Sequence, residues 1–186
     1  MKQIPYLSLI VFFLSTLFYS CSKENADNKE LILERFNGKY KILSSISNEA
    51  VDINMDGKSS TDLKTELPDL SRAFLELRIL DQPYHLFSLW WPEQYLSESH
   101  DINKPNINYA NQGIGFRFNF TNDFNKIILD TTDVTSEQAS RFVVPESVII
   151  LKDDIIKVVF NESVYTEFGW KTIRVTTTYQ RYTSIT

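Results

Sequence analysis

The chain has 186 residues and a formal net charge of −5, with 24 acidic against 19 basic side chains. No basic run offsets this acidic balance, which argues against nucleic acid as a partner because such binding depends on lysine and arginine side chains that neutralise phosphates. After the N-terminal segments described below, about 150 residues remain, enough for one domain that buries a core without disulfides.

Residues 1–20 have the layout of a secretory signal peptide, in which Lys2 precedes an apolar run from Ile4 to Phe18 and small Ser20. The alternative is a membrane-spanning helix, which usually needs about 20 apolar residues. This run is shorter and ends in the polar stretch Ser22–Asn25. Removal of the segment takes the formal charge from −5 to −6, because Lys2 is its only charged residue.

Cys21, the only cysteine in the chain, follows this segment directly. The string LFYSC resembles a lipobox, in which a small residue precedes a cysteine that becomes acylated, and bulky Phe18 and Tyr19 resemble the looser lipoboxes of Bacteroidetes. An exported chain with one cysteine cannot form an internal disulfide, so a free thiol here would be a liability. The alternative is an incidental cysteine near a cleavage site.

Lipid on Cys21 is therefore the predicted anchor. Two or three acyl chains anchor strongly, since each buried methylene contributes about 0.8 kcal/mol. This predicts an outer-membrane lipoprotein that faces the periplasm or the cell surface, with the membrane as its partner and no protein partner identified. Polar residues 21–35 are expected to form the lipid anchor and a flexible tether, and residues 36–186 the folded domain.

From Phe36 onward, apolar side chains alternate as strands require. The clearest strands are residues 72–80, 113–120 and 170–182, with a hairpin at Lys152–Asp154 between strands 147–151 and 155–161. Further strands are expected at residues 40–47 and 84–91, the second ending at Pro92 where a backbone donor is lost. The inward positions are Ala73, Leu75, Leu77, Ile79, Ile114, Phe116, Phe118, Phe120, Ile173, Val175, Thr177 and Tyr179.

The sequence predicts an all-β domain with one short helix at residues 61–67, capped by Ser59 or Ser60 and ended by Pro68. About eight strands joined in sequence favour an up-and-down antiparallel barrel, which removes exposed edges by closing on itself. A two-sheet β-sandwich is the alternative. Residues 93–112 and 131–146 are expected to be long polar connections at the mouth.

Three strings resemble lipocalin-like lipoproteins of Bacteroidetes: FNGKYKILSS from Phe36, AVDINMDGKSSTDL from Ala50 and GWKTIRVTTTYQRY from Gly169. The first resembles the Gly-x-Trp opening of lipocalins, with Tyr40 in place of Trp, and the last resembles their closing strand with a late arginine, here Arg181. The resemblance implies a calycin-like barrel whose floor Tyr40 closes against Arg181.

Asp52, Asn54 and Asp56 stand at alternate positions before Gly57, which is the spacing of an EF-hand calcium loop. The twelfth position holds Leu63 instead of a bidentate acid. A degenerate calcium loop is therefore a weak candidate, and a solvated turn is favoured. No other cofactor is expected.

The sequence argues against an enzyme, because it offers only His85, His100 and a thiol committed to lipid. Adjacent His100 and Asp101 point to opposite faces of an extended chain, and Asp153-Asp154 lies at a turn. An envelope enzyme would need a histidine to meet a carboxylate across strands.

Binding is the favoured function, because aromatic residues make up 13% of the chain. Adjacent Trp90 and Trp91 must point to opposite faces of a strand, so one is expected in the core and the other exposed or covered by a loop. An exposed tryptophan beside Tyr95 would suit a sugar or another flat apolar ligand, and Phe116 and Phe118 would line the interior. The alternative is a structural or protein-interaction lipoprotein with a packed barrel and no ligand.

Overall fold

The computed structural model describes residues 29–81, 83–97 and 105–183. The chain divides after Arg35, and the barrel domain begins at Phe36. The predicted signal peptide, Cys21, the tether up to residue 28 and His100 lie outside the described residues, whereas residues 29–36 are helical. None of the helices in these described ranges is both long and apolar enough to cross a membrane.

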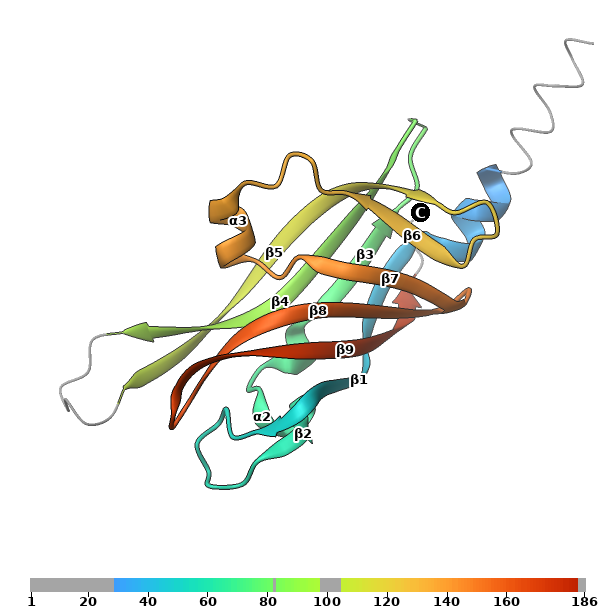
Figure 1. Ribbon diagram of the computed structural model, residues 1–186. Helices are drawn as coiled ribbons and strands as arrows, with labels where there is room; N and C mark the ends of the chain where they lie inside the picture. Colours follow the sequence, from blue (N-terminus) through green and yellow to red (C-terminus); the bar gives the residue numbers. More distant parts are fainter. Residues whose placement is uncertain (1–28, 82, 98–104, 184–186) are drawn as a thin grey trace, which may run out of the picture. The chain divides into compact units, whose positions relative to one another are not determined.

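The domain is a closed antiparallel barrel of eight strands in up-and-down order (Figure 1). Each strand pairs with the next, and pairing of the last with the first closes the sheet, which confirms the predicted barrel and excludes an open sandwich. A short ninth strand, β2 (Ser60–Asp62), pairs with the far end of the first. The barrel strands are β1 (Gly38–Val51), β3 (Phe74–Arg78), β4 (His85–Ser97), β5 (Asn106–Phe120), β6 (Lys126–Asp130), β7 (Pro145–Lys152), β8 (Ile155–Thr166) and β9 (Gly169–Thr183).

Alternating apolar side chains fill the interior, as the sequence predicts. On β3, Leu75 and Leu77 are fully buried, and on β9 the burial of Ile173, Val175 and Tyr179 follows the predicted face. Aromatic rings pack together at the end of the barrel where β5 finishes, with the Phe118 and Phe120 ring centroids 5.2 Å apart and the Phe36 and Phe120 centroids 4.8 Å apart. We call this the aromatic end: Phe36, His85, Phe118, Phe120 and Phe124.

Strand β1 changes its inward face halfway along its length. Its register with β9 shifts by one residue between Ile42 and Ser44. The buried position is therefore even-numbered before the shift, at Tyr40, and odd-numbered after it, at Ser45 and Ser47. An extra residue in one strand bends it and re-aims the side chains beyond it.

Four strands run clearly further than the sequence predicts: β1, β4, β5 and β8. Strand β4 passes through Pro92 to Ser97, and β8 continues past Asn161 to Thr166. Proline is tolerated in β4 because the β3 ladder ends at Phe74 opposite Trp90, so one edge of β4 beyond that point has no β3 partner to hydrogen-bond. The expected polar connection at residues 93–112 is therefore largely a long β4–β5 hairpin.

The helices differ in part from expectation. Helix α2 (Leu63–Glu66) lies within the predicted range, but its N-cap is Asp62, whose carboxylate accepts a hydrogen bond from the Lys64 N–H at 3.0 Å. A 3₁₀ turn, η1 (Leu70–Arg72), follows Pro68. A further helix, α3 (Ser136–Arg141), occupies the segment predicted to be an irregular connection.

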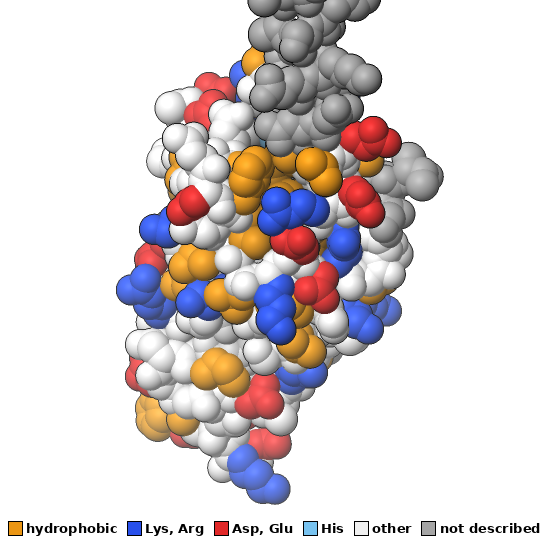
Figure 2. All heavy atoms as spheres, turned by 90° about the vertical axis from the view of Figure 1, so that its right-hand side faces the viewer, with side chains coloured by type: hydrophobic (Ala, Val, Ile, Leu, Met, Phe, Trp, Pro, Cys, Tyr) orange, Lys and Arg blue, Asp and Glu red, His pale blue; other side chains and the backbone are white. Residues whose placement is uncertain are grey.

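Charges of both signs are interspersed with hydrophobic side chains on the face shown in Figure 2, without a large area of one sign. This face therefore carries no basic patch of the kind that binds nucleic acid.

Candidate functional site

The wall of the barrel carries a pocket of about 480 Å³ where the β7–β8 ladder stops. That ladder ends at Pro145 opposite Phe160, while β8 continues to Thr166. Helix α3 and the segment after it lie beside this stretch of β8. The volume falls in the usual range of ligand pockets, about 300–1,000 Å³. We call this the window pocket; it is lined by Glu93, Gln94, Ala139, Ser140, Arg141, Phe142, Val143, Asn161, Glu162, Ser163, Trp170 and Thr172.

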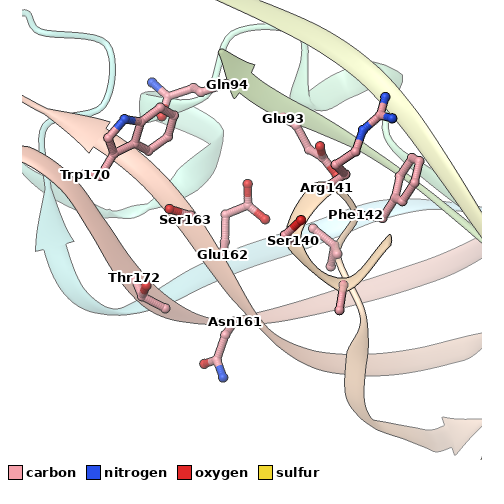
Figure 3. A pocket seen from close by; sticks show the side chains of 12 residues that line it. Glu93, Gln94, Ser140, Arg141, Phe142, Asn161, Glu162, Ser163, Trp170 and Thr172 are labelled. Carbon is pink, nitrogen blue, oxygen red and sulfur yellow. The ribbon is translucent and has the colours of Figure 1, made fainter. Parts of the chain in front are cut away.

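Glu162 is the central side chain of the window pocket. Strand alternation places it on the same inward face as Phe160 and Val164, both of which are buried. Its side chain points into the pocket between Gln94 and Trp170 on one side and Ser140 and the neighbouring Glu93 on the other (Figure 3). Only 5% of Glu162 is exposed, so its carboxyl group is held in a poorly solvated position.

Burial raises the pKa of Glu162 well above its usual value, and the nearby carboxyl group of Glu93 raises it further. Burial likewise raises the pKa of Glu93 to about 7, although the Val143 backbone N–H and the Arg141 guanidinium act in the opposite direction. Desolvation disfavours the charged form of a carboxyl group, and a like charge nearby adds to the effect. A raised pKa favours the protonated form, in which a carboxyl group can both donate and accept a hydrogen bond.

Gln94 joins β4 to β8 across the pocket wall. Its side-chain Oε1 accepts a hydrogen bond from the Tyr165 backbone N–H at 2.7 Å, and its Nε2 donates to the Tyr165 carbonyl at 3.5 Å. The same Nε2 donates to the Tyr109 hydroxyl at 3.2 Å. This amide therefore supplies bonds that a neighbouring strand would otherwise make, and it fixes the width of the pocket.

The rim combines an aromatic ring with polar groups. Trp170 is 51% exposed, and its ring stands edge-on to Tyr165 with centroids 5.4 Å apart. Arg141 lies over the Phe142 ring at 5.6 Å and pairs with Glu137 at 4.0 Å. Apart from Glu93, Glu162 and Arg141, the polar side chains of the lining are neutral amides and hydroxyls, which suit hydrogen bonding.

The predicted ligand-binding aromatics do not form one site. Trp91 is buried and packs edge-on against Phe160 at 4.8 Å, whereas Trp90 on the outer face is 37% exposed and stacks on Phe74 at 5.6 Å. Their opposite placement confirms the prediction from alternation. Tyr95 is exposed further along β4.

Phe116 and Phe118 are buried, and they pack against Phe87 and His85 respectively. Their part of the interior is filled by aromatic side chains. The Trp91 side chain lies close to Glu162 and acts to lower the pKa of that carboxyl group. The Trp91 Nε1 is buried without a hydrogen bond of normal geometry.

The candidate calcium loop forms a turn held by its own side chains. Asp52 accepts hydrogen bonds from the backbone N–H groups of Asp56 at 3.1 Å and Gly57 at 2.8 Å, and Asn54 accepts from Asp56 at 2.9 Å. Within the described ranges, three or more His, Cys, Asp or Glu side chains do not converge as a metal site would require. Calcium binding stays a prediction.

Sequence reasoning missed Glu93, Glu162 and α3. Glu162 continues the alternation of Ile156, Val158 and Phe160, so extending that strand by one residue would have placed it inside. For α3, the signal is the capping box of Thr135 and Gln138, in which each side chain bonds the other residue's backbone N–H at 3.1 and 3.0 Å.

Comparison of the chain with models of known protein families and with curated proteins found no match.

Proposed function

We propose that this chain is a membrane-anchored envelope lipoprotein whose barrel binds a small carbohydrate at the window pocket without acting on it chemically. The observation that carries this proposal is the buried Glu162 carboxyl group beside an exposed Trp170 in a pocket of about 480 Å³. Sugars present hydroxyl groups at their edges and apolar C–H faces, so they need hydrogen-bonding groups together with an aromatic surface.

The pocket favours a hydroxyl-rich ligand over an apolar one. Glu162, Gln94, Asn161 and Ser163 bring carboxyl, amide and hydroxyl groups to the lining of one site. An apolar ligand would offer no hydrogen bond to the buried Glu162 carboxyl group, and a buried polar group without a partner costs about 1–3 kcal/mol.

The anchor belongs to the same proposal. The signal segment, the lipobox-like string and the lone Cys21 support export and acylation, and they support a location at the outer membrane. Phe36, where the domain begins, packs on Phe120 at one end of β5, whereas Gln94 and Tyr109 meet near the other end. Eleven strand residues separate these points by roughly 35 Å along β5, so the window pocket lies well away from the point where the domain begins.

A lipocalin-like relationship is part of the proposal and is supported at the first strand. Tyr40 lies directly opposite Arg181 in the β1–β9 ladder, and the guanidinium acts on the pKa of the buried phenol. The Tyr40 hydroxyl donates a hydrogen bond to the Phe36 carbonyl at 2.7 Å. This register supports the proposed relationship, because the resemblance implies an aromatic residue and an arginine side by side at this position.

The second candidate is a protein-interaction lipoprotein without a ligand. Close packing of the aromatic end and of Leu75, Leu77, Phe87 and Leu89 in the interior favours it, because little of the barrel's volume is then left for a ligand. The window pocket is the feature that separates the two candidates.

A glycan array tests the proposal, using the full-length protein purified in a detergent without sugar headgroups. We expect the wild-type protein to bind a defined set of glycans, Trp170→Ala to lose binding about tenfold or more, and Trp90→Ala to retain it. Trp90 is a matched control, because it is also a partly exposed tryptophan but lies on the outer face of β4. Absence of glycan binding by the wild-type protein would overturn the proposal.

The anchor has its own test. We expect intact mass spectrometry of the membrane fraction to find acyl chains on Cys21 and no residues 1–20, and a Cys21→Ser variant to lose both modifications. An unacylated Cys21 would contradict this part of the proposal and leave carbohydrate binding unaffected.

A further inference from the structure

A second hollow, of about 290 Å³, borders the β8–β9 turn on the side of β1. The β1–β9 ladder ends at Ser47 opposite Val175, although β1 continues to Val51 and β9 begins at Gly169. Beyond that point a wedge opens between β1 and β9, spanned by the Lys171–Glu49 ion pair at 2.6 Å. The hollow lies in this wedge, and Trp170 lines it as well as the window pocket.

The turn between the two hollows carries two exposed aromatic side chains. Phe168 is 92% exposed and Trp170 is 51% exposed. The turn is ordered by Thr166, whose hydroxyl accepts from the Phe168 N–H at 3.3 Å and donates to the Gly169 carbonyl at 3.1 Å. Exposed aromatics on a fixed backbone lose little conformational freedom on binding, which favours stacking against a ligand.

We propose that the two hollows are neighbouring subsites of one extended site, so that the ligand is an oligosaccharide and not a single sugar. One sugar unit lies in the window pocket against Glu162, the chain crosses Trp170, and a further unit lies in the second hollow against Phe168. This inference rests on the proposed carbohydrate binding, and it specifies the length and direction of the ligand.

The second subsite differs from the first in its chemistry. The two oxygens of Asp52 at its edge already accept backbone N–H groups, and Lys171 is paired with Glu49. The Ser59 hydroxyl and the Phe168 ring are the other features a sugar would meet. We therefore expect this subsite to act mainly by stacking and to add affinity without strict selectivity.

Calorimetric titration of the full-length protein tests this with glucose, mannose, galactose and N-acetylglucosamine, each as a β-linked series of one, two and four units. We expect the four-unit member of the bound series to bind at least tenfold more tightly than the single sugar. Phe168→Ala should weaken binding of the four-unit sugar by about tenfold, the effect of losing one aromatic stacking contact. The same variant should leave affinity for the single sugar unchanged.

Tyr182→Ala is the matched control, because Tyr182 is an exposed aromatic at the other end of β9. It should change neither affinity. If no series binds the wild-type protein, the proposed function fails together with this inference. If a series binds but its affinity does not rise with length, or Phe168→Ala weakens all lengths equally, only the extended site is overturned.

Discussion

Two regions of this barrel, the aromatic end and the window pocket, place different kinds of side chain at the inward positions of their strands. At the aromatic end, inward positions hold apolar rings, and Phe36 and Phe118 are almost completely buried. Around the window pocket, the same inward alternation on β8 places the carboxyl group of Glu162 where an apolar side chain would pack. The aromatic end therefore stabilises the fold, whereas burial of the Glu162 carboxyl group at the window pocket costs stability.

The difference arises from how far the ladders extend. Strand β5 is paired on both sides near Phe118, by His85 of β4 and Leu129 of β6. Strand β8 loses its β7 partner beyond Phe160, and the Gln94 side chain supplies the next bonds. Regions that depend on side-chain bridges in place of complete ladders open more readily, which is typical of binding sites.

The largest effect is expected at the aromatic end. Phe118→Ala removes a buried ring and leaves a cavity, so we expect it to lower the free energy of unfolding by about 3–5 kcal/mol. Ile128→Ala is the control, because Ile128 is 55% exposed on the neighbouring strand and should change stability by less than about 0.5 kcal/mol. Urea unfolding followed by circular dichroism measures both. Equal effects would show that the aromatic end is not packed as described.

The second prediction concerns pH at the window pocket. Because burial raises the pKa of Glu162 and of Glu93 in the folded state, the folded protein binds more protons than the unfolded chain. Their contribution to stability is complete below the unfolded pKa of about 4.5 and is lost as pH rises through the folded values. We expect the free energy of unfolding to fall as pH rises from about 4.5 to about 7, the range between the unfolded value and the folded pKa of Glu93, with a slope of up to about 1.4 kcal/mol per pH unit from each group.

Glu162→Gln should flatten that dependence, since glutamine does not titrate, and leave only the part due to Glu93. Glu167→Gln removes an exposed carboxylate from the β8–β9 turn and should keep the wild-type slope. Chemical denaturation at half-unit pH steps gives the slopes. A wild-type slope retained by Glu162→Gln would contradict the assignment of the pH dependence to this group.

The aromatic end could be predicted from the sequence and the window pocket could not. Apolar residues at every second position, such as Phe116 and Phe118 on β5 or Val175 and Tyr179 on β9, predict the inward face of a strand from local sequence alone. The same signal predicts Trp90 and Trp91 on opposite faces. It does not say which strands meet, and Glu93 and Glu162 approach each other only through the closed barrel.

Two residues made the ends of β4 and β8 difficult to predict from the sequence. Pro92 normally marks the end of a strand, but it lies where β4 has already lost its β3 partner. A glutamate normally marks a solvent-facing position, yet Glu162 is buried because it continues the inward alternation of Phe160 on β8.

A smaller effect is expected from the bridge between β4 and β8. Gln94→Ala leaves the Tyr165 N–H without its 2.7 Å acceptor, so we expect a loss of about 1–3 kcal/mol. Hydrogen exchange at the Tyr165 amide should become faster. Gln112→Ala, on β5 opposite Trp91, is the control and should leave that amide unchanged. Unchanged Tyr165 exchange in Gln94→Ala would show that the bridge does not hold the wall.

The smallest effect on global stability is expected at α3, which has no buried residue. Thr135→Ala removes the N-cap acceptor of the Gln138 N–H, which costs the helix about 0.5–2 kcal/mol. Because this loss is confined to a short surface helix, the unfolding midpoint should barely move, while amide exchange within α3 rises several-fold.

The same variant should weaken ligand binding, because Ala139, Ser140 and Arg141 line the window pocket and must be ordered to contact a ligand. Thr135→Ser keeps the hydroxyl acceptor and should restore both exchange and affinity. If exchange in α3 rises without any change in affinity, then α3 covers the pocket without taking part in binding. The ligand contacts would then come from β4, β8 and β9 alone.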